Sequence, residues 1–245
     1  ELPAGVRLAT AKRGGVTVTR VEIAREGLAR PRGRYVTLEM PSVSVLDERD
    51  TDVIETGAAE LRALLPPEGP VLVLGIGNRR VTADALGPRT AQKILVTMGP
   101  QHTLPVRCIR PVAALAPGVS GDTGLTLRQL AAAMVDAVRP AALICVDSLC
   151  SAEAARLGRT IQFSDTGLHP ADARHARHLD AAALGVPVIA AGIPTLMDAD
   201  EGADLVLTPR ALDSVIAHGS ALLAGILNRA LQPRLSVAQL CWLTG

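Results

Sequence analysis

From Pro70 onward the chain alternates short apolar runs with longer amphipathic segments. The apolar runs have the length of strands and lie at Val71–Gly75, Val106–Val112, Ala141–Asp147, Thr160–Phe163 and Val186–Ala191. The amphipathic segments lie at Thr82–Thr97, Leu125–Val138, Ser151–Leu157 and Pro209–Leu231. Continuous apolar runs indicate strands buried on both faces, and their alternation with helices is typical of a parallel sheet. We therefore predict an α/β fold, in which a mainly parallel sheet is sandwiched between two layers of helices.

The first 66 residues follow a different pattern. Val16–Ile23 and Arg34–Glu39 alternate apolar and polar residues, which indicates half-exposed antiparallel strands. A helix is expected over Asp50–Leu65, because the two prolines that follow cannot continue it. We predict that this amino-terminal β/α portion, residues 1–66, packs on the α/β core of residues 70–245 within a single domain.

Two aspartates follow predicted strands. Asp147 ends a strongly apolar run, and Asp84 comes after the glycine-bent loop Gly75-Ile-Gly-Asn78. Ligands of open α/β sheets bind at the carboxyl ends of the strands, so both acids would reach one cleft. Asp84 also has an alternative role as an acid that stabilises a helix start. A carboxylate at the position of Asp147 would be poorly solvated, which is typical of a paired or functional group. Two such carboxylates would share one proton, so that they could activate water and protonate a leaving amine.

A polar turn after the predicted strand Thr160–Phe163 is a second candidate. It contains Asp165-Thr-Gly167, the triplet of pepsin-type aspartic proteases, although three residues of this kind more often form an ordinary turn. His169 follows closely, and together with Asp84 and Asp147 it would form a set that suits a divalent metal.

Other chemistries find less support in the sequence. Gly75-Ile-Gly77 lacks the third glycine of a dinucleotide-binding loop, because Arg80 occupies its place. Cys150 is a nucleophile candidate only if a histidine lies beside it, and is otherwise a buried thiol.

Composition narrows the class of protein further. The 245 residues carry a net charge of +1 without a basic stripe, so we expect no nucleic-acid partner. The apolar runs are too short to cross a membrane, and the amino terminus does not have the pattern of a signal peptide. The four cysteines form no Cys-x-x-Cys pair, which favours an intracellular, reducing compartment.

Several motifs resemble, in the same order, those of the germination protease family, the endopeptidases that degrade small acid-soluble spore proteins. They are Gly33–Glu39, Val73–Asn78, Val81–Pro88, Ala116–Val119 with Thr123-Gly124, Val146–Leu149, Gln162–Pro170, Gly185–Thr195 and Asn228–Pro233. The resemblance covers most of the chain and is more specific than any single motif.

The resemblance implies an atypical aspartic protease with Asp84 and Asp147 as catalytic residues. Asn78, Thr166, Gly167 and His169 are then expected to orient the acids or bind substrate, with no metal and no other cofactor. It also implies a zymogen that loses an amino-terminal propeptide, a homotetramer, and small acid-soluble spore proteins as substrates in the cytoplasm of the spore core.

Two alternatives remain open at this point. Hydrogenase maturation proteases have a similar Gly-Ile-Gly-Asn turn, and their metal-binding residues would fall on Asp84, Asp147 and His169. The other is a non-catalytic binding protein with the same fold. For the protease, Arg79, Arg80 and Arg110 are candidates to contact an acidic substrate residue beside the scissile bond, since they lie near predicted strand ends.

Overall fold

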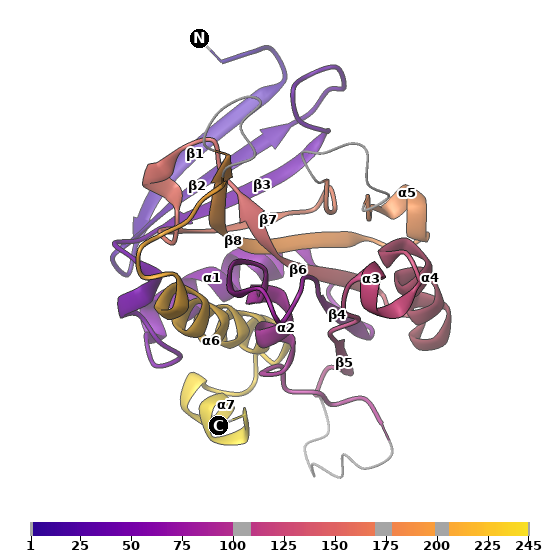
Figure 1. The fold of residues 1–245 in the computed structure, drawn as a ribbon. Coiled ribbons are helices and arrows are strands. Elements are labelled where there is room, and N and C mark those ends of the chain that lie inside the picture. Colours follow the sequence, from indigo (N-terminus) through magenta and orange to yellow (C-terminus); the bar gives the residue numbers. More distant parts are fainter. Residues whose placement is uncertain (1, 100–108, 170–177, 199–205, 245) are drawn as a thin grey trace.

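A long mixed sheet runs through the computed structural model, which describes residues 2–99, 109–169, 178–198 and 206–244 (Figure 1). Its strand order is β1-β2-β3-β7-β8-β6-β4-β5, and β9 pairs with the end of β8. The strands are β1 (Val6–Arg13), β2 (Val16–Ile23), β3 (Gly33–Glu39), β4 (Val71–Gly75), β5 (Val112–Leu115), β6 (Ala142–Cys150), β7 (Thr160–Ser164), β8 (Val188–Asp198) and β9 (Val206–Leu207).

The parallel core consists of β5, β4, β6 and β8. Val71 of β4 pairs with Ala142 of β6, so the two strands that end near the candidate acids are neighbours in one sheet. Both are buried along their apolar runs, as the sequence predicts for strands covered on both faces.

The amino-terminal strands extend this core as an antiparallel meander. β2 and β3 coincide closely with the predicted strands Val16–Ile23 and Arg34–Glu39. β3 joins the rest through β7, which pairs antiparallel with both β3 and β8. On the helix side, the Nε of Arg20 in β2 donates to Oε2 of the buried Glu60 at 2.6 Å and ties the meander to the helix that follows it.

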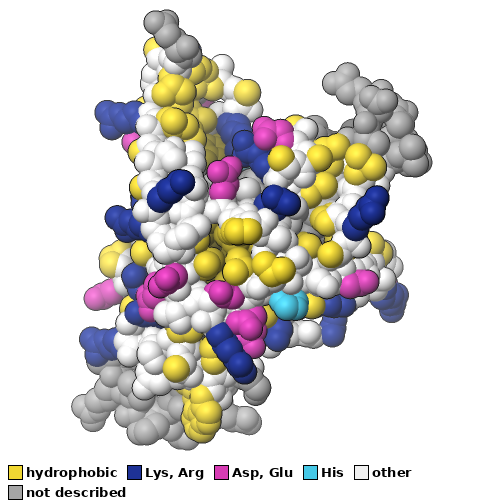
Figure 2. All heavy atoms as spheres, turned by 90° about the vertical axis from the view of Figure 1, so that its left-hand side faces the viewer, with side chains coloured by type: hydrophobic (Ala, Val, Ile, Leu, Met, Phe, Trp, Pro, Cys, Tyr) yellow, Lys and Arg dark blue, Asp and Glu magenta, His cyan; other side chains and the backbone are white. Residues whose placement is uncertain are grey.

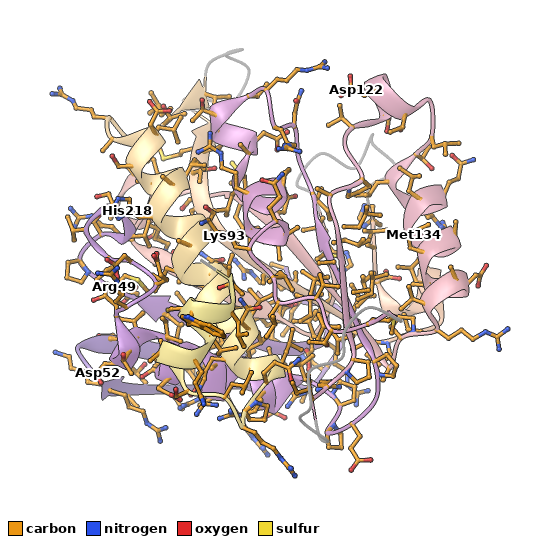
Figure 3. All side chains as sticks on the ribbon, turned by 90° about the horizontal axis from the view of Figure 1, so that it is seen from below. Arg49, Asp52, Lys93, Asp122, Met134 and His218 are labelled. Atoms are coloured by element: carbon orange, nitrogen blue, oxygen red, sulfur yellow. The ribbon has the colours of Figure 1, made fainter. Side chains whose placement is uncertain are left out.

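Helices cover both faces of the core. They are α1 (Thr51–Leu64), α2 (Leu86–Ala91), α3 (Ser120–Thr123), α4 (Leu127–Val138), α5 (Ala181–Leu184), α6 (Leu212–Leu231) and α7 (Val237–Thr244), with 3-10 turns η1 (Val43–Val45), η2 (Thr82–Asp84) and η3 (Ala154–Arg156). The larger hydrophobic core joins one sheet face to α1 and α6, and a smaller one joins the other face to α4. Seen from below, Met134 of α4 and His218 of α6 lie on opposite sides of the strands (Figure 3). The predicted three-layer α/β arrangement is confirmed.

The helix α6 is the apolar centre of its layer. By length and composition alone it would be able to cross a membrane, but 72% of its most apolar window is buried inside the fold. It packs against α1 and α2 and behaves as the core helix of a layered α/β protein.

Three predicted elements differ from the structure. The expected helix Thr82–Thr97 is the turn η2 followed by the short α2, and the expected helix Ser151–Leu157 contains only η3. Of the expected strand Val106–Val112, residues 106–108 lie outside the described part, and the observed strand begins at Val112. The region 82–97 breaks early because its backbone packs directly on the sheet edge, as described next.

Candidate active site

Asp84 is held by the loop that follows β4. Its Oδ2 accepts a hydrogen bond from the backbone N–H of Asn78 at 2.7 Å. Gly77 has φ +123°, and a Cβ at this position would overlap the carbonyl oxygen of Asp84. The loop therefore folds onto Asp84 in a way that only glycine permits.

The segment around Asp84 rests on the carboxyl ends of the parallel strands. A Cβ at Gly87, in the first turn of α2, would overlap the carbonyl oxygens of Ile76 and Val146. From β8, the hydroxyl of the buried Thr195 donates to the carbonyl of Ala83 at 2.9 Å. The close backbone contacts at Gly87 and the hydrogen bond from Thr195 fix Asp84 relative to β4, β6 and β8.

Asp147 lies on β6 at the same edge. Its Oδ1 accepts from the backbone N–H of Ser148 at 2.8 Å, and its strand partner on β8 is Gly192. Burial, and secondly the charge of Asp147, raises the pKa of the Cys145 thiol. Alternate residues of a strand share a face, so the carboxylate lies on the same side of β6 as Cys145. The hydroxyl of Ser148 is buried and has no hydrogen-bond partner among the described residues.

Backbone contacts connect the two acids. The N–H of Ile76 donates to the carbonyl of Val146, immediately before Asp147, at 2.8 Å. Two residues after Ile76, the N–H of Asn78 holds Asp84. The structure thus brings Asn78 of the loop after β4, Asp84 of η2 and Asp147 of β6 to one edge of the sheet. Their approach to within the reach of a shared water stays a prediction.

Thr166, Gly167 and His169 belong to the turn after β7. The N–H of Thr166 donates to Oγ of Ser164 at 3.1 Å, and the imidazole of His169 hydrogen-bonds the carbonyl of Thr166 at 2.7 Å. Gly167 has φ +85°, and a Cβ there would overlap the carbonyl of Leu179. The turn therefore packs against the backbone at Leu179, and it borders a groove.

This groove has a volume of about 310 Å³ and lies over β3, β7 and β8. Thr166, Gly167 and His169 line it, and Leu149 of β6 lines it near the candidate acid. Leu149 follows Asp147 by two residues, and its Cγ would lie 2.8 Å from a Cβ placed on Gly192. The groove thus begins beside the strand position of Asp147.

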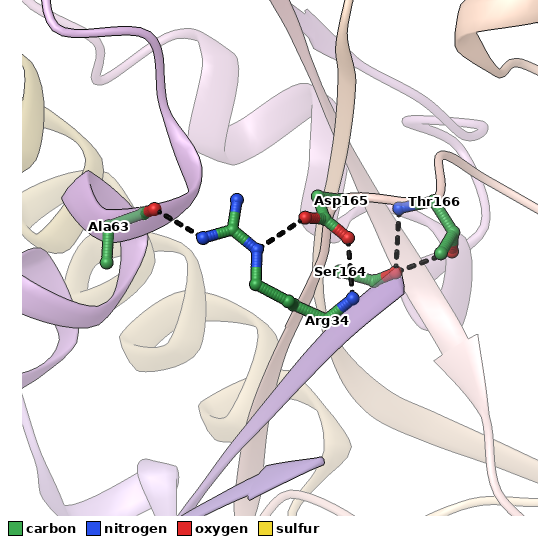
Figure 4. Close-up of polar contacts among 5 residues, drawn as sticks. All are labelled: Arg34, Ala63, Ser164, Asp165 and Thr166. Atoms are coloured by element: carbon green, nitrogen blue, oxygen red, sulfur yellow. Dashed lines mark hydrogen bonds and ion pairs between the residues drawn. The ribbon is translucent and has the colours of Figure 1, made fainter. Parts of the chain in front are cut away.

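The carboxylate of Asp165 makes contacts that hold parts of the fold together (Figure 4). Its Oδ2 accepts from Nε of Arg34 at 2.7 Å, and its Oδ1 accepts from the backbone N–H of the same residue at 2.7 Å. Arg34 also donates to the carbonyl of Ala63 at the end of α1. The Asp-Thr-Gly triplet therefore joins the turn to β3 and α1.

We expect Asp165→Asn to lower the free energy of unfolding by about 1 kcal/mol, because it weakens a partly exposed ion pair. Peptidase activity should stay within about twofold of the native value, since the ion pair of Arg34 with Asp165 stabilises the turn. Urea denaturation and a cleavage assay measure the two effects. A loss of activity larger than the loss of stability explains would return Asp165 to the set of catalytic candidates.

Two of the arginine candidates, Arg110 and Arg80, have side-chain partners within the chain. Arg110 donates to the carbonyls of Gly69 and Glu68, at the amino end of β4, so the expectation that it contacts substrate at the active edge is wrong. Arg80 pairs with Asp122 at 3.3 Å on the surface. On the face shown in Figure 2, charges of both signs are interspersed rather than gathered into a basic patch.

The structure does not support the alternative in which Asp84, Asp147 and His169 together bind a metal ion. No three His, Cys, Asp or Glu side chains of the described residues are arranged to hold a metal ion, and Asp84, Asp147 and His169 all belong to that part of the chain. His169 instead approaches His178, with their Nδ1 atoms 3.2 Å apart.

Gly192 and Thr195 were not identified from the sequence. A glycine inside a strand often marks a close approach of another group, and Gly192 within Ala190-Ala-Gly-Ile193 carries that signal. The role of Thr195 depends on the contact of β8 with η2, which the sequence does not reveal.

Comparison with known proteins shows which family the chain resembles. The family model described as germination protease matches residues 3–201. A germination protease of Clostridium perfringens is 32% identical over 90% of this chain and 86% of its own length. That of Caldanaerobacter subterraneus is 40% identical over 81% of this chain and 65% of its own length, and that of Bacillus velezensis is 37% identical over 84% and 58%.

Among solved structures, the [NiFe] hydrogenase maturation protease HycI from Thermococcus kodakarensis is similar, with a TM-score of 0.47 and 16% identity over 70% of this chain and 98% of that one. The family match and the relatives, by contrast, extend over most of the chain at higher identity. The chain therefore belongs to the germination protease family and is a peptidase of spore germination.

Proposed function

We propose that this chain hydrolyses small acid-soluble spore proteins in the spore core, with Asp84 and Asp147 as a catalytic pair. The observation that carries the proposal is the anchoring of both carboxylates at one sheet edge. Asp84 is held by the loop after β4, and Asp147 extends from the neighbouring β6. Family membership supplies the reaction, peptide hydrolysis.

In the proposed mechanism one aspartate acts as the general base and the other as the general acid. One carboxylate, ionised, takes a proton from the attacking water, while its partner, protonated, donates to the leaving amine. Each acid accepts a backbone N–H bond, from Asn78 and from Ser148, and these bonds orient the carboxylates. Because the two carboxylates are coupled, their titration belongs to the pair rather than to either residue.

Assembly and processing are part of the same proposal. We infer a homotetramer, and activation by loss of an amino-terminal propeptide, from the family resemblance. Light scattering on the purified protein tests the first. A species of about 25 kDa alone, the mass of one chain, would contradict it.

The decisive experiment is cleavage of a purified small acid-soluble spore protein. Such substrates are expected to be disordered when released from DNA, and a disordered segment can enter a groove in extended form. We expect a few defined fragments by mass spectrometry, and no cleavage of a stably folded control protein. Asp84→Asn should produce none of these fragments, which excludes a contaminating protease. Absence of cleavage by the processed native protein would favour the maturation-type or the non-catalytic alternative.

A further inference from the structure

His169 and His178 face each other across a short antiparallel bridge. Leu168 pairs with Leu179, and each donates its backbone N–H to the carbonyl of the other, at 2.8 and 3.1 Å. Next to such a doubly bonded pair, an antiparallel ladder has a pair of residues that lie opposite without hydrogen bonds, where side chains approach most closely. His169 and His178 occupy that position.

The bridge fixes the direction of both rings. Leu168 and Leu179 are buried in the smaller core, whereas both histidines are exposed, because successive side chains of an extended segment point to opposite faces. The two imidazoles therefore leave the backbone on the same side and meet above it.

The hydrogen bond of His169 determines which of its ring nitrogens carries a lone pair. Its Nε2 lies 2.7 Å from the carbonyl of Thr166, which can only accept, so Nε2 carries the hydrogen and donates it. The neutral ring then has its lone pair on Nδ1, the atom directed at His178. A ring N–H bonded to a backbone carbonyl is the usual support of a metal-binding histidine, since it fixes the tautomer and raises the basicity of the other nitrogen.

The separation of the two rings fits a single metal ion. Their Nδ1 atoms are 3.2 Å apart, and the ring planes are inclined by 64°. Two Zn–N bonds of about 2.05 Å that span this distance enclose an angle of about 100°, close to the tetrahedral value. A hydrogen bond between two neutral rings has the same separation, so the alternatives differ in whether a metal ion can take the place of the shared hydrogen.

The ligand types select among divalent ions. Imidazole nitrogens suit Zn²⁺, Cu²⁺ and Ni²⁺, whereas Mg²⁺ and Ca²⁺ prefer oxygen ligands. Of the described carboxylates, those nearest in sequence are engaged elsewhere, since Asp180 accepts from the N–H of Ala183 and Asp165 pairs with Arg34. No third His, Cys, Asp or Glu of the described residues completes the set, so water would fill the remaining positions.

We propose that His169 and His178 form a Zn²⁺ site in the wall of the groove, with both Nδ1 atoms as ligands and water in the open positions. His169 lines the groove beside Thr166 and Gly167, so the bound ion and its waters narrow it. Zn²⁺ thereby hinders entry of a peptide and inhibits the peptidase reversibly, without a part in the hydrolysis. The inhibition rests on the proposed function, whereas the binding of Zn²⁺ does not.

Calorimetric titration of the purified chain with ZnCl₂ tests the binding. We expect one such site in the native protein and at least a tenfold weaker affinity in both His169→Ala and His178→Ala, because each removes one of the two protein ligands. MgCl₂ should give no binding. His218→Ala is the matched control and should keep the native affinity, since His218 is also exposed and also hydrogen-bonds a backbone carbonyl, that of Leu46 at 2.8 Å.

Thermal unfolding separates loss of the site from loss of the fold. ZnCl₂ should raise the Tm of the native protein, because a ligand of the folded state stabilises it, and should leave the Tm of a folded His178→Ala unchanged. No binding by the native protein, or an equal Zn²⁺ affinity in the native protein and both alanine variants, would overturn the site.

Inhibition is measured separately with a peptide that the native protein cleaves. Excess ZnCl₂ should raise KM by about tenfold with kcat unchanged, which indicates weaker substrate binding, and EDTA should restore the original KM. For His178→Ala, added ZnCl₂ should leave KM as it was. Zn²⁺ that binds at both histidines without raising KM would overturn the inhibitory role. If the native protein cleaves no peptide, the proposed function fails, and the titration still decides whether the Zn²⁺ site exists.

Discussion

Asp147→Asn is expected to lower kcat/KM by about three orders of magnitude or more, while the free energy of unfolding changes by less than about 1 kcal/mol. The amide has the size of the carboxylate, and its oxygen can still accept the N–H of Ser148. It cannot exchange a proton with water or with a leaving amine, so the chemistry is lost and the packing is kept. We expect the same of Asp84→Asn, whose amide oxygen can still accept from Asn78.

The control for both variants is Asp122→Asn. Asp122 is an exposed acid that pairs with Arg80, and its loss should leave kcat/KM within about twofold. Single-turnover cleavage and urea denaturation measure activity and stability on the same samples. A variant of Asp84 or Asp147 that retains a tenth of native activity would remove that residue from the pair.

Gly77→Ala is expected to be nearly as damaging, for a reason of backbone geometry. A Cβ at Gly77 would overlap the carbonyl of Asp84 and press on its carboxylate, and the φ of +123° is strained for alanine. We expect a loss of about 3 kcal/mol in the free energy of unfolding and at least a hundredfold loss in kcat/KM, because Asp84 must move.

Gly99→Ala separates the two causes. Gly99 has a similar φ of +133°, but none of the residues that the structure describes lies within 4 Å of an added Cβ. The Gly99→Ala variant should lose only about 1–2 kcal/mol of the free energy of unfolding, through backbone strain, and should keep its peptidase activity. If Gly77→Ala were as active as Gly99→Ala, the loop would not position Asp84.

The parallel core was predictable because burial on both faces leaves a strong pattern. The runs at Val71 and Ala141 have no alternative to being central strands, and the prediction that they share a sheet is confirmed. β1 escaped prediction because it is an edge strand, mostly exposed, and its sequence Val-Arg-Leu-Ala-Thr-Ala-Lys-Arg lacks a clear apolar face. The direction of β7 was equally hidden, since a five-residue strand has the same sequence pattern in a parallel and an antiparallel pairing.

The candidate site was predictable in part. Acids at strand ends can be recognised from one sequence, and the structure places Asp84, Asp147 and Asn78 at a common edge. The position of the groove was not recognisable, because it depends on the register of β3 against β7, two segments far apart in the chain.

The antiparallel pairing of β3 with β7 has a consequence for how the chain folds. Tyr35–Glu39 pairs with Thr160–Ser164, so the first three strands leave the ribosome about 120 residues before their partner. Closing so long a loop carries a large entropic cost, which slows this step relative to local hairpin formation. Until then the inner edge of β3 offers unpaired N–H and C=O groups, which can pair with another chain. A nascent or truncated protein that ends before β7 is thus exposed to aggregation through β3, and completion of β7 protects that edge.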